Sequence, residues 1–119
     1  MTTCKTILEG LDAGAYDARL SRIYCVTGEE VTAHRRRVAD AVARYQALFA
    51  AGDGAPVSVY SGPGRTELGG NHTDHQHGRV LAASVNLDML AVAAPNGTRT
   101  IRIQSEGYSA LEVDLSLLT

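Results

Sequence analysis

The apolar pattern of the chain changes its period at Pro56, and this change constrains the fold more than any other feature of the sequence. Upstream, apolar residues recur at steps of three, four and seven, as on one face of an amphipathic helix. Downstream, short β-branched segments alternate apolar and polar residues, which is typical of strands with one buried face. Helices followed by strands predict an α+β domain with a mixed, largely antiparallel sheet. The residues that carry the helical pattern are Val31, Val38, Val42, Tyr45 and Phe49.

Two helices are expected before this change. The shorter covers about residues 14–25, and the longer runs over about 28–51. Thr27 followed by Glu30 predicts a capping box at the start of the longer helix, because each side chain can accept from the backbone N–H of the other residue. The basic cluster at 34–37 is typical of a solvated helix face, with a phosphate-binding patch as the alternative. The shorter helix rests on the spacing of Tyr16, Leu20 and Ile23.

Four or five strands are expected in the second half of the chain. The segment 57–60 predicts a strand that leads directly into a glycine-rich stretch, and 80–95 returns to strand character after it. Asn96-Gly97 is a strong two-residue hairpin signal, so we expect the strand before it to pair with 98–105. A last alternating run at 110–118 predicts one more strand at an edge of the sheet.

Composition and charge exclude several classes of protein. With 119 residues there is room for one small domain, and 45% apolar with 20% charged residues is the balance of a globular chain. A net charge of −2 gives no long-range attraction to nucleic acid or to an anionic membrane. The longest mostly apolar run is shorter than the roughly 20 residues that cross a bilayer. Cys4 and Cys25 have neither the number nor the spacing of a disulfide framework or a zinc site, so a cytoplasmic protein without a membrane span is expected.

The stretch "PGRTELGGNHTDHQHG" at 63–78 has the composition of a site. It contains four glycines, three histidines, two acids and an arginine, and Leu68 is its single bulky apolar residue. Polar groups at this density are too costly to bury unless each finds a partner. We therefore expect this stretch to lie where the protein meets water, a ligand or a metal.

Two kinds of site fit the stretch poorly. A phosphate-binding loop would need Gly-Lys-Ser/Thr at the start of a helix, and no such lysine follows the glycines. A zinc site is suggested by His72, Asp74, His75 and His77. In an extended segment, however, the first two would face one way and the last two the other. Surface histidines on a loop are the commoner arrangement.

A sugar site fits more of these residues. Arg65, Asn71, His72 and Asp74 provide a guanidinium, an amide, an imidazole and a carboxylate, which together can hold several hydroxyl groups in one orientation. The pair Gly69-Gly70 would let the backbone approach a ligand, although the two glycines could equally serve a tight turn.

The segment "GPGRTELGGNHTDHQHGRVL" resembles the galactokinase signature of the GHMP kinase family. In that signature a strand leads into Pro-Gly-Arg, an apolar and glycine segment, a Glu-His-x-Asp cluster and a Val-Leu strand. The resemblance covers about residues 58–94, after a helix as in that family. It implies the N-terminal part of a GHMP kinase fold, with 1–119 as a single partial domain, 1–27 as an N-terminal extension and 28–119 as the galactose-binding signature region.

The resemblance also implies roles for individual residues. Arg65 takes the position of the catalytic arginine near the transferred phosphate, His72 that of a histidine in the sugar pocket, and Asp74 that of the carboxylate that accepts from ring hydroxyls. Asn71 stands where the family usually has a sugar-binding glutamate, and Glu67 stands where an asparagine is usual. We predict that the substrate-binding residues are Asn71, His72, Asp74 and Glu67. We expect the exchanges at Asn71 and Glu67 to alter the sugar specificity.

A galactokinase transfers the γ-phosphoryl group of ATP to the C1 hydroxyl of galactose, so the resemblance implies ATP and Mg²⁺ as cofactors of an intact parent enzyme. The family's Gly-Leu-x-Ser-Ser-Ala nucleotide loop and its catalytic aspartate do not occur in the 119 residues. We therefore expect an N-terminal piece that is inactive alone and binds no cofactor itself. Two alternatives remain, a non-catalytic galactokinase-like sugar sensor and an α+β interaction domain.

Such a piece would have an incomplete sheet. Its unpaired edges and an uncovered apolar face predict self-association, by strand pairing or by exchange of strands. The apolar residues that would need a covering layer are Val80, Leu81, Val85, Leu87, Leu90 and Val92.

Overall fold

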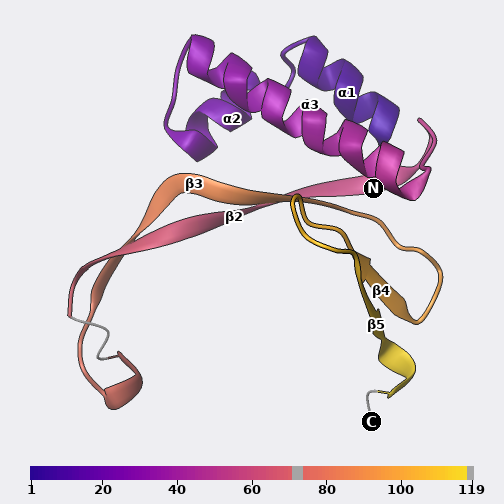
Figure 1. Ribbon diagram of the computed structural model, residues 1–119. Helices are drawn as coiled ribbons and strands as arrows, with labels where there is room; N and C mark the ends of the chain where they lie inside the picture. The colour runs from indigo at the N-terminus through magenta and orange to yellow at the C-terminus, as the bar shows by residue number, and fades with distance from the viewer. Residues whose placement is uncertain (71–73, 118–119) are drawn as a thin grey trace.

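The computed structural model describes residues 1–70 and 74–117, and it has the α+β class predicted from the sequence (Figure 1). Three helices precede most of the strands, and two short 3₁₀ turns follow β2 and β5. The helices are α1 (Cys4–Asp12), α2 (Asp17–Tyr24) and α3 (Glu29–Phe49), the strands are β1 (Thr2–Thr3), β2 (Pro56–Gly69), β3 (Leu81–Ala93), β4 (Thr100–Ile103) and β5 (Leu111–Asp114), and the 3₁₀ turns are η1 (Asp74–Gln76) and η2 (Leu115–Leu117).

Helix α1 was not predicted from the sequence, so the expectation of two helices is wrong. Its N-cap is Thr3, whose side chain accepts from the backbone N–H of Thr6 at 3.2 Å. Its buried residues Cys4, Ile7 and Leu11 follow helical spacing and join the core. The helix has nine residues, too short to be stable by propensity alone, and it depends on this packing.

Helix α2 lies inside the predicted range but turns a different face to the core. Leu20 and Tyr24 are buried, whereas Ile23 is exposed. Tyr24 lies four positions after Leu20, so it occupies the buried stripe that the sequence pattern assigned to Ile23. The C-cap residue Cys25 ends the helix in the left-handed conformation, with φ of 55°.

Helix α3 confirms the predicted long helix and most of its stripe. Val31, Val38 and Val42 are buried. The acidic residues Glu29 and Glu30 lie in the first turn, where the helix dipole has its positive end and stabilises negative charge. The predicted capping box is wrong, because the N-cap is Gly28, at φ of 60°, and no side chain caps the helix there. Phe49 lies at the last turn and is exposed.

Strands β2 and β3 form a long antiparallel pair, and β1 adds a short strand beside β2. Strand β2 continues from the predicted 57–60 through Gly69, so the first half of the glycine-rich stretch is strand rather than loop. Its pairing with β3 shifts twice, between Pro63 and Arg65 and between Glu67 and Gly69. The helices cover one face of this sheet at one end only, and beyond them both strands curve away (Figure 1).

The hairpin predicted at Asn96-Gly97 is wrong. Strand β4 pairs with β5 in a second sheet, with Ile101 opposite Val113. The Asn96 side chain instead accepts from the Thr98 backbone N–H at 3.0 Å and donates to the Thr100 carbonyl at 2.8 Å. This local turn leads the chain into β4 without pairing it to β3. All strand pairs of the described residues are antiparallel, so the mixed sheet predicted from the sequence is replaced by two antiparallel ones.

The core lies between the helices and one end of the first sheet. Its fully buried side chains are Val42, Val57 and Cys4, and Leu90 and Val92 of β3 are packed against it. The radius of gyration is 17.7 Å, whereas a compact chain of this length has roughly 13–14 Å. The accessible surface is 8874 Å², against roughly 6,200 Å² for a compact monomer of this mass. Much of the strand surface is therefore uncovered.

Candidate functional site

Two of the predicted site residues lie on β2 beyond the part that the helices cover. Arg65 pairs with Ser84 of β3, and Glu67 pairs with Ala82. The pairing is regular from Arg65 to Glu67, so these two side chains project from the same face of the strand. Both are exposed, and Arg65 makes no hydrogen bond or ion pair with the described residues. Its planar guanidinium keeps five donors for a ligand.

The remaining predicted residues fall in the connection between β2 and β3. Asn71 and His72 lie outside the described residues. Asp74 begins the 3₁₀ turn η1, which ends before His77. His77 itself is exposed and has a positive φ of 61°. Within residues 1–70 and 74–117, no three histidine, cysteine, aspartate or glutamate residues gather as a metal site.

The base of this connection is fixed by a glycine. Gly70 has φ of 115°, and a Cβ atom there would lie 2.5 Å from both the carbonyl oxygen of Arg79 and the Cα of Val80. No other residue fits, because the conformation disfavours side chains and the backbone opposite leaves no room. Gly70 therefore lies directly against Arg79 and Val80, at the end of the strand that carries Arg65 and Glu67.

The comparison with known families decides what this hairpin is. Residues 43–95 match the family model described as the galactokinase galactose-binding signature. This part of the chain is galactokinase-like. The match begins within α3, includes β2, the connection and β3, and ends two residues after β3. No solved structure matches the chain.

The galactokinase-like region presents a polar strand face next to the connection between β2 and β3. Arg65 and Glu67 supply a cation and an acid on one strand face. Hydroxyl groups bind best to such sets of fixed donors and acceptors. No helix in the part of the chain that the structure describes is long and apolar enough to cross a membrane.

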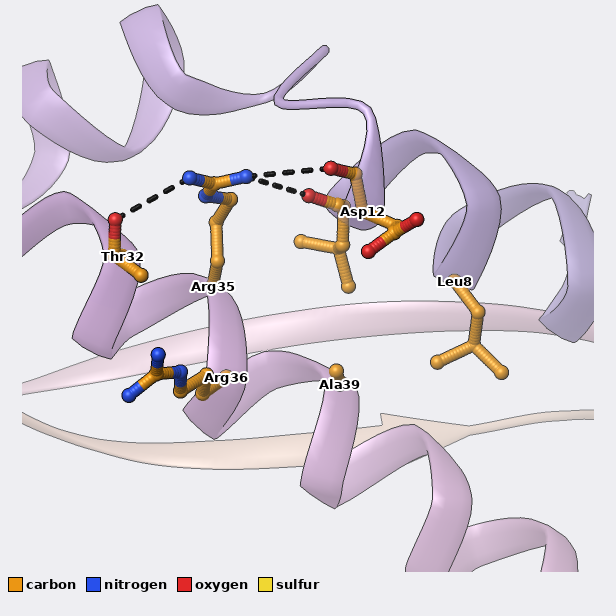
Figure 2. A pocket seen from close by; sticks show the side chains of 7 residues that line it. Leu8, Asp12, Thr32, Arg35, Arg36 and Ala39 are labelled. Atoms are coloured by element: carbon orange, nitrogen blue, oxygen red, sulfur yellow. Dashed lines mark hydrogen bonds between the residues drawn. The ribbon is translucent and has the colours of Figure 1, made fainter.

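A hollow of about 430 Å³ lies elsewhere, between α1 and α3 (Figure 2). Arg35 is one of the charged residues that line it, and both of its terminal nitrogens are engaged in hydrogen bonds. They reach the carbonyls of Leu11 at 3.2 Å and Asp12 at 3.4 Å and the hydroxyl of Thr32 at 3.2 Å. Its Nε also lies 3.1 Å from a carboxylate oxygen of Asp17, although the two atoms are not aligned for a hydrogen bond. Arg35 therefore caps the end of α1, and the hollow contains none of the galactokinase-like site residues.

Sequence reasoning missed a polar cluster around Asp88. Its carboxylate accepts from Tyr24 at 2.7 Å, from Ser61 and from Arg37, and its side chain is only 2% exposed. The pattern placed Arg37 among solvated helix residues and Asp88 on the polar side of a half-buried strand. The available signal was the position of Asp88 two residues before Leu90 and four before Val92, because that spacing puts an acid in an apolar row.

The chemistry of this cluster favours an ionised carboxylate. Burial alone raises the pKa of Asp88, but the hydrogen bonds from Ser61, Tyr24 and Arg37 lower it, and the net pKa lies below the ordinary value of 3.8. Burial, and then the hydrogen bond to Asp88, raises the pKa of Tyr24 above its ordinary 10.0. The cluster therefore combines a charged carboxylate with a neutral phenol at neutral pH.

Proposed function

We propose that this chain supplies the sugar-binding part of a cytoplasmic sugar kinase that transfers the γ-phosphoryl group of ATP to the C1 hydroxyl of galactose or a related hexose. The observation that carries the proposal is the match of residues 43–95 to the galactokinase galactose-binding signature. In the reaction, the C1 oxygen forms the new bond to the γ-phosphorus as the bond from that phosphorus to the ADP oxygen breaks, and the hydroxyl proton passes to a base of the complete enzyme or to water. ATP and Mg²⁺ belong to the complete enzyme, and this chain alone is proposed to be inactive.

Each predicted residue has a proposed role in that site. Arg65 stabilises the negative charge of the transferred phosphoryl group, which suits an exposed guanidinium without a partner among the described residues. Asp74 and His72 hold ring hydroxyls, and Asn71 and Glu67 set which sugar is accepted. Glu67 shares the strand face of Arg65, so an acid at this position lies close to the reacting end of the sugar.

Calorimetric titration of the chain with galactose tests the sugar-binding part of the proposal. We expect saturable binding that Asp74→Ala abolishes, because a carboxylate that accepts from two hydroxyls has no substitute in alanine. Asp53→Ala, an exposed acid before β2, is the matched control and should bind as the parent chain does. Equal binding by both variants, or no binding by the parent chain, would overturn the proposed site.

A non-catalytic sugar sensor is the second candidate, and the exchanged residues Asn71 and Glu67 are compatible with it. A sensor and a kinase would both bind the sugar, so binding does not separate them. Incubating the full-length gene product with ATP, Mg²⁺ and galactose does. Formation of ADP at the rate of sugar phosphorylation supports the kinase, whereas sugar binding without ADP formation supports the sensor.

We also propose that the chain associates with a second copy of itself. The sheet face away from the helices exposes Tyr60, Leu87 and Met89, and β3 is an edge strand within the described residues. The accessible surface exceeds that of a compact monomer by roughly 2,700 Å². A stable interface needs roughly 1,200–2,000 Å². The uncovered area is therefore sufficient for a dimer that extends or covers this sheet.

A further inference from the structure

Asp88 occupies a position that its strand neighbours fill with apolar side chains. Asp88, Leu90 and Val92 lie two residues apart along β3, so their side chains project from the same face of the strand. Leu90 and Val92 pack against the core on the helix side. The Asp88 side chain is 2% exposed. Burying a carboxylate in such a row is unfavourable unless charged and polar partners surround it.

The partners of Asp88 come from three other elements. Tyr24 at the end of α2 donates to Oδ2 at 2.7 Å, and Ser61 of β2 donates to the same oxygen. Arg37 of α3 donates through Nη1 to Oδ1 and through Nη2 to the backbone carbonyl of Asp88 at 2.7 Å. Tyr24 is itself stacked on His34 of α3, with ring centroids 3.7 Å apart and planes within 7°. One residue of β3 is thereby joined to α2, α3 and β2.

This cluster lies where the helix-covered part of the sheet ends. Asp88 pairs with Pro63, the last pair before the first register shift of β2. Gly64 stands in the shift, where a Cβ atom would lie 3.1 Å from the carbonyl oxygen of Leu87. Past the shift, residues 64–69 and 81–87 form the distal arm, the part of the hairpin that curves away from the helices (Figure 1). The distal arm carries Arg65 and Glu67.

We propose that Asp88 is a positioning residue that fixes the orientation of the distal arm relative to the helices. This shift is a natural point of bending, because β3 contributes residues 85–87 opposite the single residue Gly64 of β2. The contacts of Tyr24, Arg37 and Ser61 hold both strands immediately before this point, so the direction in which the arm leaves the helices is set at Asp88. The consequence for the sugar rests on the proposed function: Arg65 meets the rest of the site only when the arm is held in this direction.

Amide hydrogen exchange of the full chain, followed by mass spectrometry, tests the proposal without any sugar. Arg37→Gln and Asp88→Asn both remove the charge pair, and Arg37→Gln changes a partly exposed residue, so the chain keeps its fold even if Asp88→Asn does not. We expect exchange in the distal arm to become roughly tenfold faster, because a hydrogen bond to a charged group is lost. Glutamine still offers Asp88 an amide donor, so exchange in α1 and in the buried face of α3, which reports global unfolding, should accelerate less than exchange in the distal arm. Arg37→Lys, which keeps the cation, should restore part of the protection.

Arg102→Gln is the matched control, because it makes the same exchange in the exposed ion pair of Arg102 with Glu112 on the other sheet. It should leave the distal arm unaffected. Unchanged exchange of the arm in Arg37→Gln would overturn the proposal, and so would equal acceleration in arm and helices, which indicates global destabilisation. Galactose titration of Arg37→Gln then adds the functional readout, where we expect roughly tenfold weaker binding, because the displaced arm also carries the proposed sugar-binding residue Glu67. If the parent chain binds no galactose, the proposed function fails, while the exchange result still decides the role of Asp88.

Discussion

Arg37 on α3 and Asp88 on β3 are joined twice, through the carboxylate and through the backbone carbonyl of Asp88. The arginine is partly exposed, whereas the carboxylate is almost completely buried. The pair is therefore asymmetric: removing the arginine leaves a buried charge with two neutral donors, Tyr24 and Ser61. Such a loss is expected to cost more than the loss of an exposed ion pair.

The first prediction concerns the stability that this pair provides. Arg37→Met should lower the free energy of unfolding by about 2 kcal/mol, because a hydrogen bond to a buried charged group contributes about 1.5–3 kcal/mol. Arg102→Met removes an exposed pair and should cost less than about 1 kcal/mol. Urea unfolding followed by circular dichroism measures both. Equal losses in the two variants would show that Asp88 does not depend on Arg37.

The second prediction is the pH dependence of stability. The pKa of Asp88 is lower in the folded chain than its ordinary value of 3.8, so the folded state favours the ionised form. Its contribution is therefore complete above about pH 5 and is lost as the pH falls through the folded pKa. Asp88→Asn should flatten the acid part of a curve of urea midpoint against pH. A curve with the same acid slope as the parent chain would contradict this assignment.

The third prediction concerns Tyr24 and the alkaline part of the dependence of stability on pH. Its pKa is raised above 10.0, so its contribution is present below that pH and is lost as the pH rises through the folded pKa. Tyr24→Phe should remove this alkaline loss, because phenylalanine keeps the ring against His34 but has no phenol to ionise. Thermal unfolding between about pH 9 and 11 measures it. An unchanged alkaline slope would exclude Tyr24 as the cause.

The sequence predicted those features that depend on neighbouring residues. The stripe of α3 was correct at Val31, Val38 and Val42, because helical spacing alone decides which face is apolar. The signature region was recognised because its motif is contiguous. Asn96 misled the hairpin prediction, since its side chain satisfies the local backbone and leaves the pairing of β4 to a later strand. Arg37 could not be assigned, because its partner lies far along the chain and its position on the helix resembles that of any solvated arginine.

The fourth prediction concerns Gly70 at the base of the connection between β2 and β3. Gly70→Ala should lower the free energy of unfolding by about 2 kcal/mol, because it adds strain at a positive φ to a clash with the backbone of Arg79. Gly69→Ala is the control, since a Cβ atom there meets nothing within 4 Å. Urea unfolding compares the two, and galactose titration shows whether the connection keeps its binding geometry. Equal stability of the two variants would mean that the connection does not require this backbone conformation.

The last prediction concerns the uncovered face of the first sheet. Leu87 and Met89 are 75% and 77% exposed, and burial of such side chains is the main source of association energy in water. We expect sedimentation velocity to show dimers whose fraction rises with protein concentration, and Leu87→Lys to shift the chain to monomers because a charge at the interface would have to be desolvated. Leu48→Lys, an exposed leucine on α3, should leave the dimer intact. A concentration-independent monomer would contradict self-association, and dissociation by Leu48→Lys but not by Leu87→Lys would place the interface on the helical side instead.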